Sequence, residues 1–190
     1  VEVNIMDIFQ RNSEYDEIGK FLSPDMEVLE VGCGNGFSTN HFRNHVKHID
    51  AFDYAENMIE NAKKAFQEKE NNTFFIDNVL EPSNITKKYD VVICVRVLIN
   101  LRDLSEQEKA IKNMVSFLKP NGKLILAEGY IEGFHNLNKI RSKLNLPDME
   151  PAKINYYSSI DETMDILNRY FEVEGNFHLG SYDFLTRVVY

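Results

Sequence analysis

The sequence has 190 residues, a length at which one globular domain buries roughly 70% of its unfolded surface, and 43% of its residues are hydrophobic. Its formal net charge of −9 argues against DNA or RNA as the main partner, because nucleic-acid binding needs lysine and arginine to neutralise phosphates. No apolar run approaches the length of a membrane-spanning helix and no signal-peptide pattern is present, so we expect a cytoplasmic protein without a membrane partner. The two cysteines, Cys33 and Cys94, are expected to be buried thiols.

Residues 1–24 are expected to form a helical cover, because apolar side chains recur there at helical spacing. A short buried strand over Val28–Val31 follows, then three glycines at alternate positions, and then a helix that begins at Phe37. A strand, a glycine turn and a helix present backbone N–H groups and a helix N-terminus to a ligand. The alternative is a tight turn that binds nothing.

Two acidic residues stand at the ends of the next two strands. His48–Asp53 is predicted to be a strand that leads into an amphipathic helix over 55–66, and Thr73–Asp77 is predicted to be the third strand. The carboxylate of Asp53 would lie at the carboxyl edge of the sheet, where it can accept hydrogen bonds from both hydroxyls of a ribose. The alternatives are that Asp53 caps the following helix and that Asp77 begins a turn.

A near-continuous apolar run over Tyr89–Val95 is typical of a central parallel strand that is buried on both faces. It ends at Arg96, whose charge needs either the carboxylate of a ligand or a structural ion pair. A capping box, Ser105-x-x-Glu108, predicts the start of a helix, and a turn then leads to a fifth strand over Leu124–Ala127. Glu128 follows at the carboxyl end of that strand.

The stretch 129–158 is long for a connection between a strand and a helix, and long insertions in compact domains are usually functional or disordered. Its aromatic residues argue against disorder, so we expect it to cover the ligand edge, with a short helix over Leu137–Leu144. A second capping box, Ser159-x-x-Glu162, predicts another helix. Two antiparallel strands over Phe171–Phe177 and Tyr182–Tyr190 are expected to complete the chain.

The spacing of the glycines narrows the choice of ligand. In the dinucleotide fingerprint the third glycine comes one residue later than Gly36 does here. The segment Glu30-Val-Gly-Cys-Gly-Asn-Gly36 with Asp53, and the later Leu118-Lys-Pro-Asn-Gly122, resemble the class I S-adenosylmethionine-dependent methyltransferases over about residues 26–128. The resemblance implies an α/β fold of three layers in a single domain over 1–190. Its doubly wound sheet would have seven strands, six parallel and the last antiparallel.

The resemblance also implies where the methyl donor binds. In this family the glycine loop approaches the methionine part and the ribose, the acid after the second strand binds the ribose hydroxyls, and residues after the second and third strands lie around the adenine. For Met58, plain core packing is an equal alternative. Carried onto this sequence, the cofactor-binding residues are Glu30, Gly32, Cys33, Gly34, Asn35, Gly36, Asp53, Tyr54, Met58, Asp77, Asn78, Val79 and Val95.

The resemblance therefore implies a methyltransferase that uses S-adenosylmethionine, releases S-adenosylhomocysteine and acts on a small-molecule acceptor. Family members that methylate base amino groups carry Asn/Asp-Pro-Pro-aromatic after the fourth strand, and this chain does not. A non-catalytic cofactor-binding subunit or sensor stays open, whereas the glycine spacing weakens an NAD-dependent dehydrogenase. No cluster has metal-ligand spacing, so we expect no metal. The candidates for a general base are Glu128 and His135, and those for the acceptor site are Arg96, Asn138, Arg141, Asn155 and Tyr156.

Overall fold

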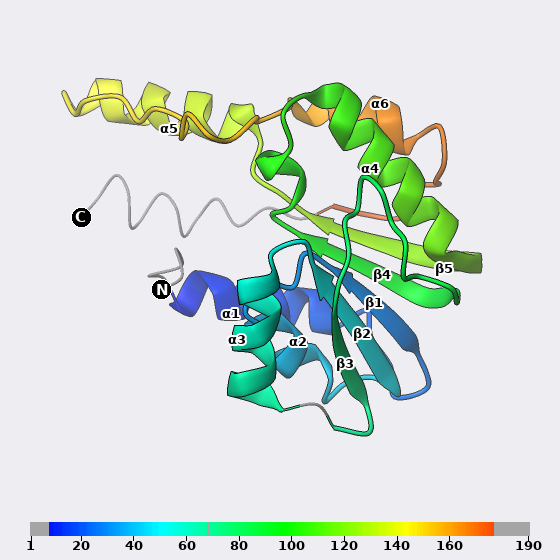
Figure 1. Ribbon diagram of the computed structural model, residues 1–190. Helices are drawn as coiled ribbons and strands as arrows, with labels where there is room; N and C mark the ends of the chain where they lie inside the picture. The colour runs from blue at the N-terminus through cyan, green and yellow to red at the C-terminus, as the bar shows by residue number, and fades with distance from the viewer. Residues whose placement is uncertain (1–7, 68, 177–190) are drawn as a thin grey trace. The chain divides into compact units, whose positions relative to one another are not determined.

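The computed structural model describes residues 8–67 and 69–176 (Figure 1). The chain divides into two compact units, which we describe one at a time. Of the described residues, the first unit comprises 8–67, 69–97 and 109–127, and the second comprises 98–108 and 128–176. None of the helices in the described ranges is long and apolar enough to cross a membrane.

The first unit is built on a parallel sheet, whose five strands among the described residues follow the order β3-β2-β1-β4-β5 (Figure 1). Because β1 is the central strand, it pairs with β2 on one side and with β4 on the other, so the segment that follows β1 leaves from the middle of the sheet. The strands are β1 (Glu27–Val31), β2 (His48–Asp53), β3 (Asn72–Ile76), β4 (Tyr89–Val95) and β5 (Leu118–Ala127).

In the described part of the chain, four helices precede or connect the strands of this sheet. They are α1 (Ile8–Gly19), α2 (Phe37–Phe42), α3 (Glu56–Phe66) and α4 (Leu104–Phe117), the last of which begins in the second unit and ends in the first. Ile18 of α1 and Phe42 of α2 are fully buried in one apolar cluster, which includes Val28 of β1. Ala62 of α3 and Phe74 of β3 belong to a second cluster. Burial of these apolar side chains is the main favourable term that holds helices on the sheet.

The second unit contains a short 3-10 helix, η1 (Leu98–Asn100), and the helices α5 (Ile131–Lys143) and α6 (Ile160–Leu167). The predicted capping box of α6 is confirmed: the Ser159 hydroxyl accepts a hydrogen bond from the N–H of Glu162, and the Glu162 carboxylate accepts one from the N–H of Ser159. These two bonds satisfy N–H groups that would lack an intrahelical partner, and they fix where α6 begins.

The α/β fold with a parallel sheet is confirmed, but the number of strands is not. Five strands are found among the described residues, whereas seven were expected. The segment 171–176 has no strand, so the prediction of a strand over Phe171–Phe177 is wrong for these residues. The predicted strand Tyr182–Tyr190 lies outside the described residues. The division into a single domain over 1–190 stays a prediction.

Three elements, α4, β5 and α5, begin at other residues than the sequence predicts. The capping box at Ser105 is wrong, because α4 begins at Leu104 and the Asp103 carboxylate accepts from the N–H of Glu106. The fifth strand is longer than predicted and includes a register shift opposite the segment between Tyr89 and Val91 of β4. Helix α5 begins six residues before the predicted helix over Leu137–Leu144.

Candidate active site

The glycine loop after β1 turns the chain sharply from the strand into α2. Gly32, Gly34 and Gly36 all have positive φ, of 70°, 52° and 82°. A Cβ at Gly32 would lie 2.3 Å from a methyl group of Val97, and one at Gly36 would lie 2.9 Å from the Cβ of Ala62. Conformation and close packing therefore both require glycine at these two positions. A Cβ at Gly34 would meet no atom within 4 Å, which leaves open space beside the loop for a ligand.

Asp53 lies against this loop. Its Oδ2 accepts a hydrogen bond of 3.0 Å from the N–H of Gly34, and its Oδ1 accepts one of 2.9 Å from the N–H of Ala55. The carboxylate is thereby held at the ends of β1 and β2, where an open α/β sheet binds its ligands. Each carboxylate oxygen has a second lone pair, so both can still accept from hydroxyl groups. The alternative that Asp53 caps α3 is wrong, because the N-cap position is Ala55.

Glu30 is buried beneath the loop, with only 2% of its surface exposed. The Thr39 hydroxyl donates to its carboxylate at 2.5 Å and so ties β1 to the first turn of α2. Burial raises the pKa of Glu30 to about 7; hydrogen bonds from Ser38 and Thr39 oppose the shift, and the negative charge of Asp53 adds to it. These contacts give Glu30 a structural role, and its contact with the cofactor stays a prediction.

Asp77 organises the loop that follows β3. Its carboxylate accepts hydrogen bonds from three backbone N–H groups, those of Asn78 at 2.8 Å, Ser83 at 3.0 Å and Asn84 at 2.9 Å. The N–H of Asp77 also donates to the carbonyl oxygen of Asp53 at 3.2 Å, so the two acids lie at neighbouring strand ends. This geometry supports the alternative in which Asp77 shapes a turn, and its contact with adenine stays a prediction.

The other predicted cofactor residues differ in how exposed their side chains are. The Tyr54 ring is 78% exposed directly after Asp53, whereas Cys33 is buried, and burial raises the pKa of its thiol well above the ordinary value. The Asn78 side chain accepts from the N–H of Leu80 and helps to close the same loop. Val79 is buried, while Asn35, Met58 and Val95 are partly exposed.

Comparison with known proteins agrees with this geometry. The model of the family described as "Methyltransferase domain" matches residues 28–122, which is half of the chain. The chain belongs to the class I S-adenosylmethionine-dependent methyltransferase domain family. The matched segment begins in β1, before the glycine loop, and ends in β5.

Relatives of this methyltransferase domain differ in the acceptors that their names state. A ubiquinone biosynthesis O-methyltransferase of Rickettsia felis is 30% identical over 115 residues, which are 60% of this chain and 44% of the relative. The chain thus spans less than half the length of this curated relative.

Solved structures show the same fold. The N-methyltransferase NodS of Bradyrhizobium japonicum, in complex with S-adenosylhomocysteine, has a TM-score of 0.67 at 18% identity, over 87% of this chain and 76% of that one. Magnesium protoporphyrin IX methyltransferase of Synechocystis, also with bound S-adenosylhomocysteine, has a TM-score of 0.65 at 21% identity, over 85% and 73% of the two chains.

Arg96, which follows β4 of the methyltransferase sheet, forms an ion pair with Glu14 of α1 at 2.6 Å. Arg96 has a positive φ of 53°, and its N–H donates to the carbonyl oxygen of Ala127 at 2.8 Å. Burial raises the pKa of Glu14, and the positive charge of Arg96 opposes that shift. Sequence reasoning missed Glu14, although its position four residues before Ile18 placed an acid on the apolar stripe of α1.

In the second unit, Glu128 caps the 3-10 helix η1. Its carboxylate oxygens accept from the N–H groups of Leu98 at 2.8 Å and Ile99 at 3.4 Å. The N–H of Tyr156 donates to the carbonyl oxygen of Ile99 at 2.9 Å. The 3-10 helix therefore joins two of the predicted site residues, Glu128 and Tyr156.

The remaining acceptor candidates in this unit form hydrogen bonds to other residues of the same unit. The Asn138 amide bonds to the backbone of Met149 through both its nitrogen and its oxygen, and the Arg141 Nε donates to the carbonyl oxygen of Pro147. The Asn155 amide donates to the Tyr157 hydroxyl at 3.1 Å. His135 is exposed on α5. Among the residues that the structure describes, no group of three or more His, Cys, Asp or Glu side chains is placed to hold one metal ion.

Proposed function

We propose that this protein transfers the methyl group of S-adenosylmethionine to a small-molecule acceptor. The observation that carries the proposal is the glycine loop held against Asp53 at the ends of β1 and β2, with open space beside Gly34. The names of similar proteins support an acceptor of this class, because they include a ubiquinone biosynthesis O-methyltransferase, the N-methyltransferase NodS and a magnesium protoporphyrin IX methyltransferase. Since these acceptors differ, the choice between nitrogen, oxygen and carbon stays open.

The cofactor supplies an electrophilic methyl group on its sulfonium, so the protein has mainly to bind and align the two reactants. In this proposal the Asp53 carboxylate accepts from the ribose hydroxyls, and the loop from Gly32 to Gly36 lies along the methionine part and the ribose. Tyr54 and Met58 lie beside the adenine. Alignment of the acceptor in line with the departing thioether can lower the barrier by several kcal/mol.

For the acceptor, the proposal gives an orienting role to Arg96, which follows β4, and separately to Glu128, which follows β5. The segment 129–158 is proposed as a cover within its own unit. Arg96 pairs with the carboxylate of Glu14, but 30% of its side chain stays exposed, which supports a second contact with an anionic acceptor. Both oxygens of Glu128 accept backbone hydrogen bonds, which hold the carboxylate in one orientation and suit it to an orienting role. His135 stays a second candidate for the base.

Calorimetry with S-adenosylhomocysteine tests the cofactor site. Asp53→Ala is expected to weaken binding by roughly ten- to a hundredfold, because one or two hydrogen bonds to a charged group are lost. Asp16→Ala, which removes an exposed acid from α1, is the matched control and should leave affinity unchanged. An unchanged affinity in Asp53→Ala would remove this residue from the site.

An assay of methyl transfer distinguishes a methyltransferase from a non-catalytic subunit or a dehydrogenase. A panel of small phenols, amines and carboxylic acids is incubated with cofactor that carries a labelled methyl group, and labelled product is expected from at least one class. Tight cofactor binding without transfer to any class would favour the non-catalytic subunit or sensor. Tight binding of NADH, with none of S-adenosylhomocysteine, would favour the dehydrogenase.

A further inference from the structure

Arg43, which follows α2 in the first unit, carries a buried positive charge, since only 9% of the residue is exposed. Its Nη1 donates to the carbonyl oxygens of Phe66 at 3.0 Å and Gln67 at 3.5 Å, at the end of α3, and to the Asn72 Oδ1 at 3.2 Å. A helix C-terminus carries about half a negative charge, so it offsets only part of the charge of the guanidinium. Among the described residues, no carboxylate forms an ion pair with Arg43.

The other edge of this guanidinium has no hydrogen-bond partner. The Arg43 Nε is fully buried and unpaired, and Nη2 forms no hydrogen bond within the described part of the chain. Nη2 is not fully buried, so solvent reaches this edge. The two nitrogens present parallel N–H groups, which match two oxygens of a carboxylate or a phosphate group.

Asn72, the first residue of β3, adds another unpaired donor and is only 1% exposed. Its Oδ1 accepts from the Arg43 Nη1 and, at 3.2 Å, from the N–H of Lys69. Because both groups that face this oxygen are donors, the amide orientation is fixed, and Nδ2 is left buried without a partner. A buried donor of this kind costs free energy unless a ligand or a water molecule accepts from it.

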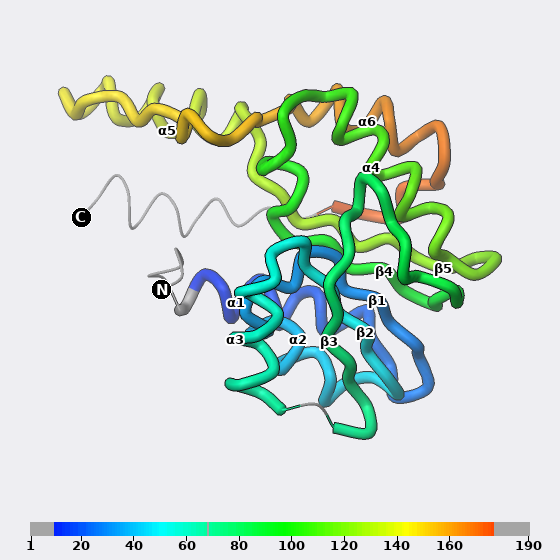
Figure 2. The backbone as a smooth tube through the Cα atoms, viewed as in Figure 1, coloured from blue at the N-terminus to red at the C-terminus, as the bar shows by residue number. Residues whose placement is uncertain are grey.

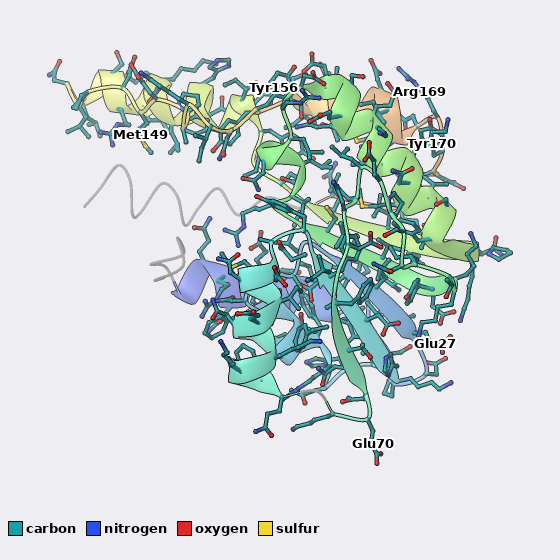
Figure 3. The ribbon with its side chains drawn as sticks, viewed as in Figure 1. Glu27, Glu70, Met149, Tyr156, Arg169 and Tyr170 are labelled. Carbon is teal, nitrogen blue, oxygen red and sulfur yellow. The ribbon has the colours of Figure 1, made fainter. Side chains whose placement is uncertain are left out.

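These donors lie away from the glycine loop. Helix α3 ends and β3 begins at the same end of the first unit (Figure 2). Because the strands are parallel, the first residue of β3 lies at the amino edge of the sheet, whereas the glycine loop leaves from the carboxyl edge. Glu70 is exposed two residues before Asn72, and Figure 3 shows its side chain pointing away from the sheet.

We propose that Arg43 and Asn72 form a binding site for an oxyanion, which is a carboxylate or a phosphate group. Every unpaired atom of the cluster is a donor and one of its groups is a cation, so the site selects an anion over a cation. A water molecule could accept the hydrogen bonds but would leave the charge without compensation. The anion accepts from Nε and Nη2 of Arg43 and from Nδ2 of Asn72. This site does not depend on methyl transfer.

Thermal melts in acetate, inorganic phosphate or chloride at equal ionic strength test the proposal. Acetate or phosphate is expected to raise the melting temperature in a saturable way, by about 3–6 °C at ten times its dissociation constant. Chloride should have a smaller effect, because one atom cannot match both N–H groups of the guanidinium edge. The more effective oxyanion distinguishes a carboxylate from a phosphate. In ¹H–¹⁵N spectra the Arg43 Nε–H signal should shift over the same concentration range.

Asn72→Asp supplies a carboxylate within the site at almost unchanged size. It should melt at a higher temperature than the unchanged protein in chloride and lose the response to both oxyanions. Arg43→Lys keeps the charge but has no planar fork, so it should weaken oxyanion binding by about tenfold. Arg102→Gln is the matched control, because it removes an arginine whose side chain is 83% exposed, and it should keep the full response.

Three results would overturn the proposal: equal shifts in all three salts, an unchanged response in Asn72→Asp, or an Arg43 Nε–H signal that does not move. Glu68 lies outside the described residues, so Glu68→Gln tests whether the chain supplies its own anion. A response to oxyanions that appears only in Glu68→Gln would also overturn the proposal, because a carboxylate of the chain would then be the partner of Arg43.

Discussion

The glycine loop allows a test in which one substitution mainly lowers stability and a neighbouring one mainly weakens cofactor binding. Gly36→Ala places a Cβ 2.9 Å from the Cβ of Ala62 and 3.0 Å from the Phe74 ring, at a φ of 82°. The left-handed conformation costs about 1–2 kcal/mol in a residue with a Cβ, and overpacking of a close contact costs about 1–3 kcal/mol. The expected loss of unfolding free energy is therefore about 2–5 kcal/mol, a large fraction of the stability of a typical domain.

Gly34→Ala is the matched control, because φ is also positive at 52° but the added Cβ meets nothing within 4 Å. It should cost about 1 kcal/mol through backbone conformation alone. The new methyl group would instead occupy the open space beside the loop, so this variant should bind S-adenosylhomocysteine more weakly while it stays folded. Gly36→Ala is expected to show the larger loss of stability.

Equilibrium unfolding in urea, followed by circular dichroism, measures the first effect, and calorimetry measures the second. Stability is compared at the transition that includes the sheet of the first unit. If Gly36→Ala were as stable as Gly34→Ala, the crowding described at Ala62 and Phe74 would not be a real constraint. If Gly34→Ala bound the cofactor product normally, the space beside Gly34 would not be part of the site.

Three further predictions concern buried acids. Because burial raises the pKa of Glu30 from 4.5 to about 7, its folded form binds the proton more tightly than its unfolded form, so its contribution is complete below pH 4.5 and is lost as pH rises toward 7. As pH rises from 5 to 8, the free energy of unfolding of Glu30→Gln should therefore increase by up to about 3 kcal/mol relative to that of the unchanged protein. Melting experiments at several pH values measure this difference, and the same pH dependence in both proteins would contradict the prediction. Asp77→Asn should lower the melting temperature, since the carboxylate accepts hydrogen bonds from three backbone N–H groups. If Asp77 also contacts adenine, this variant should lose more affinity for S-adenosylhomocysteine than for its inosine analogue. Equal losses of affinity for both ligands would leave Asp77 with a structural role in the turn alone. Arg96→Met should destabilise by about 1–2 kcal/mol by leaving Glu14 without this partner, and Glu14→Gln in the same chain should recover part of that loss; strictly additive effects would show that the pair is not coupled.

Local sequence determined most of what surrounds the cofactor loop. The strand before Gly32, the helix after Gly36 and the acid at the end of β2 all follow from neighbouring residues. Apolar periodicity and glycine conformation act over a few positions, so they can be read without the tertiary structure. The same holds for the capping box at Ser159, whose two hydrogen bonds join residues three positions apart.

Only the tertiary structure decided which polar groups become partners. Arg96 and Glu14 are 82 positions apart, and nothing in either local pattern indicates the other. The capping box at Ser105 failed because Asp103, two residues earlier, already supplies the oxygen that begins α4. The Asp77 carboxylate is held by backbone N–H groups up to seven residues away, which depends on how the whole loop folds. A buried charge takes whichever partner the packing of distant segments brings within reach, and that choice is made by the folded chain rather than by adjacent residues.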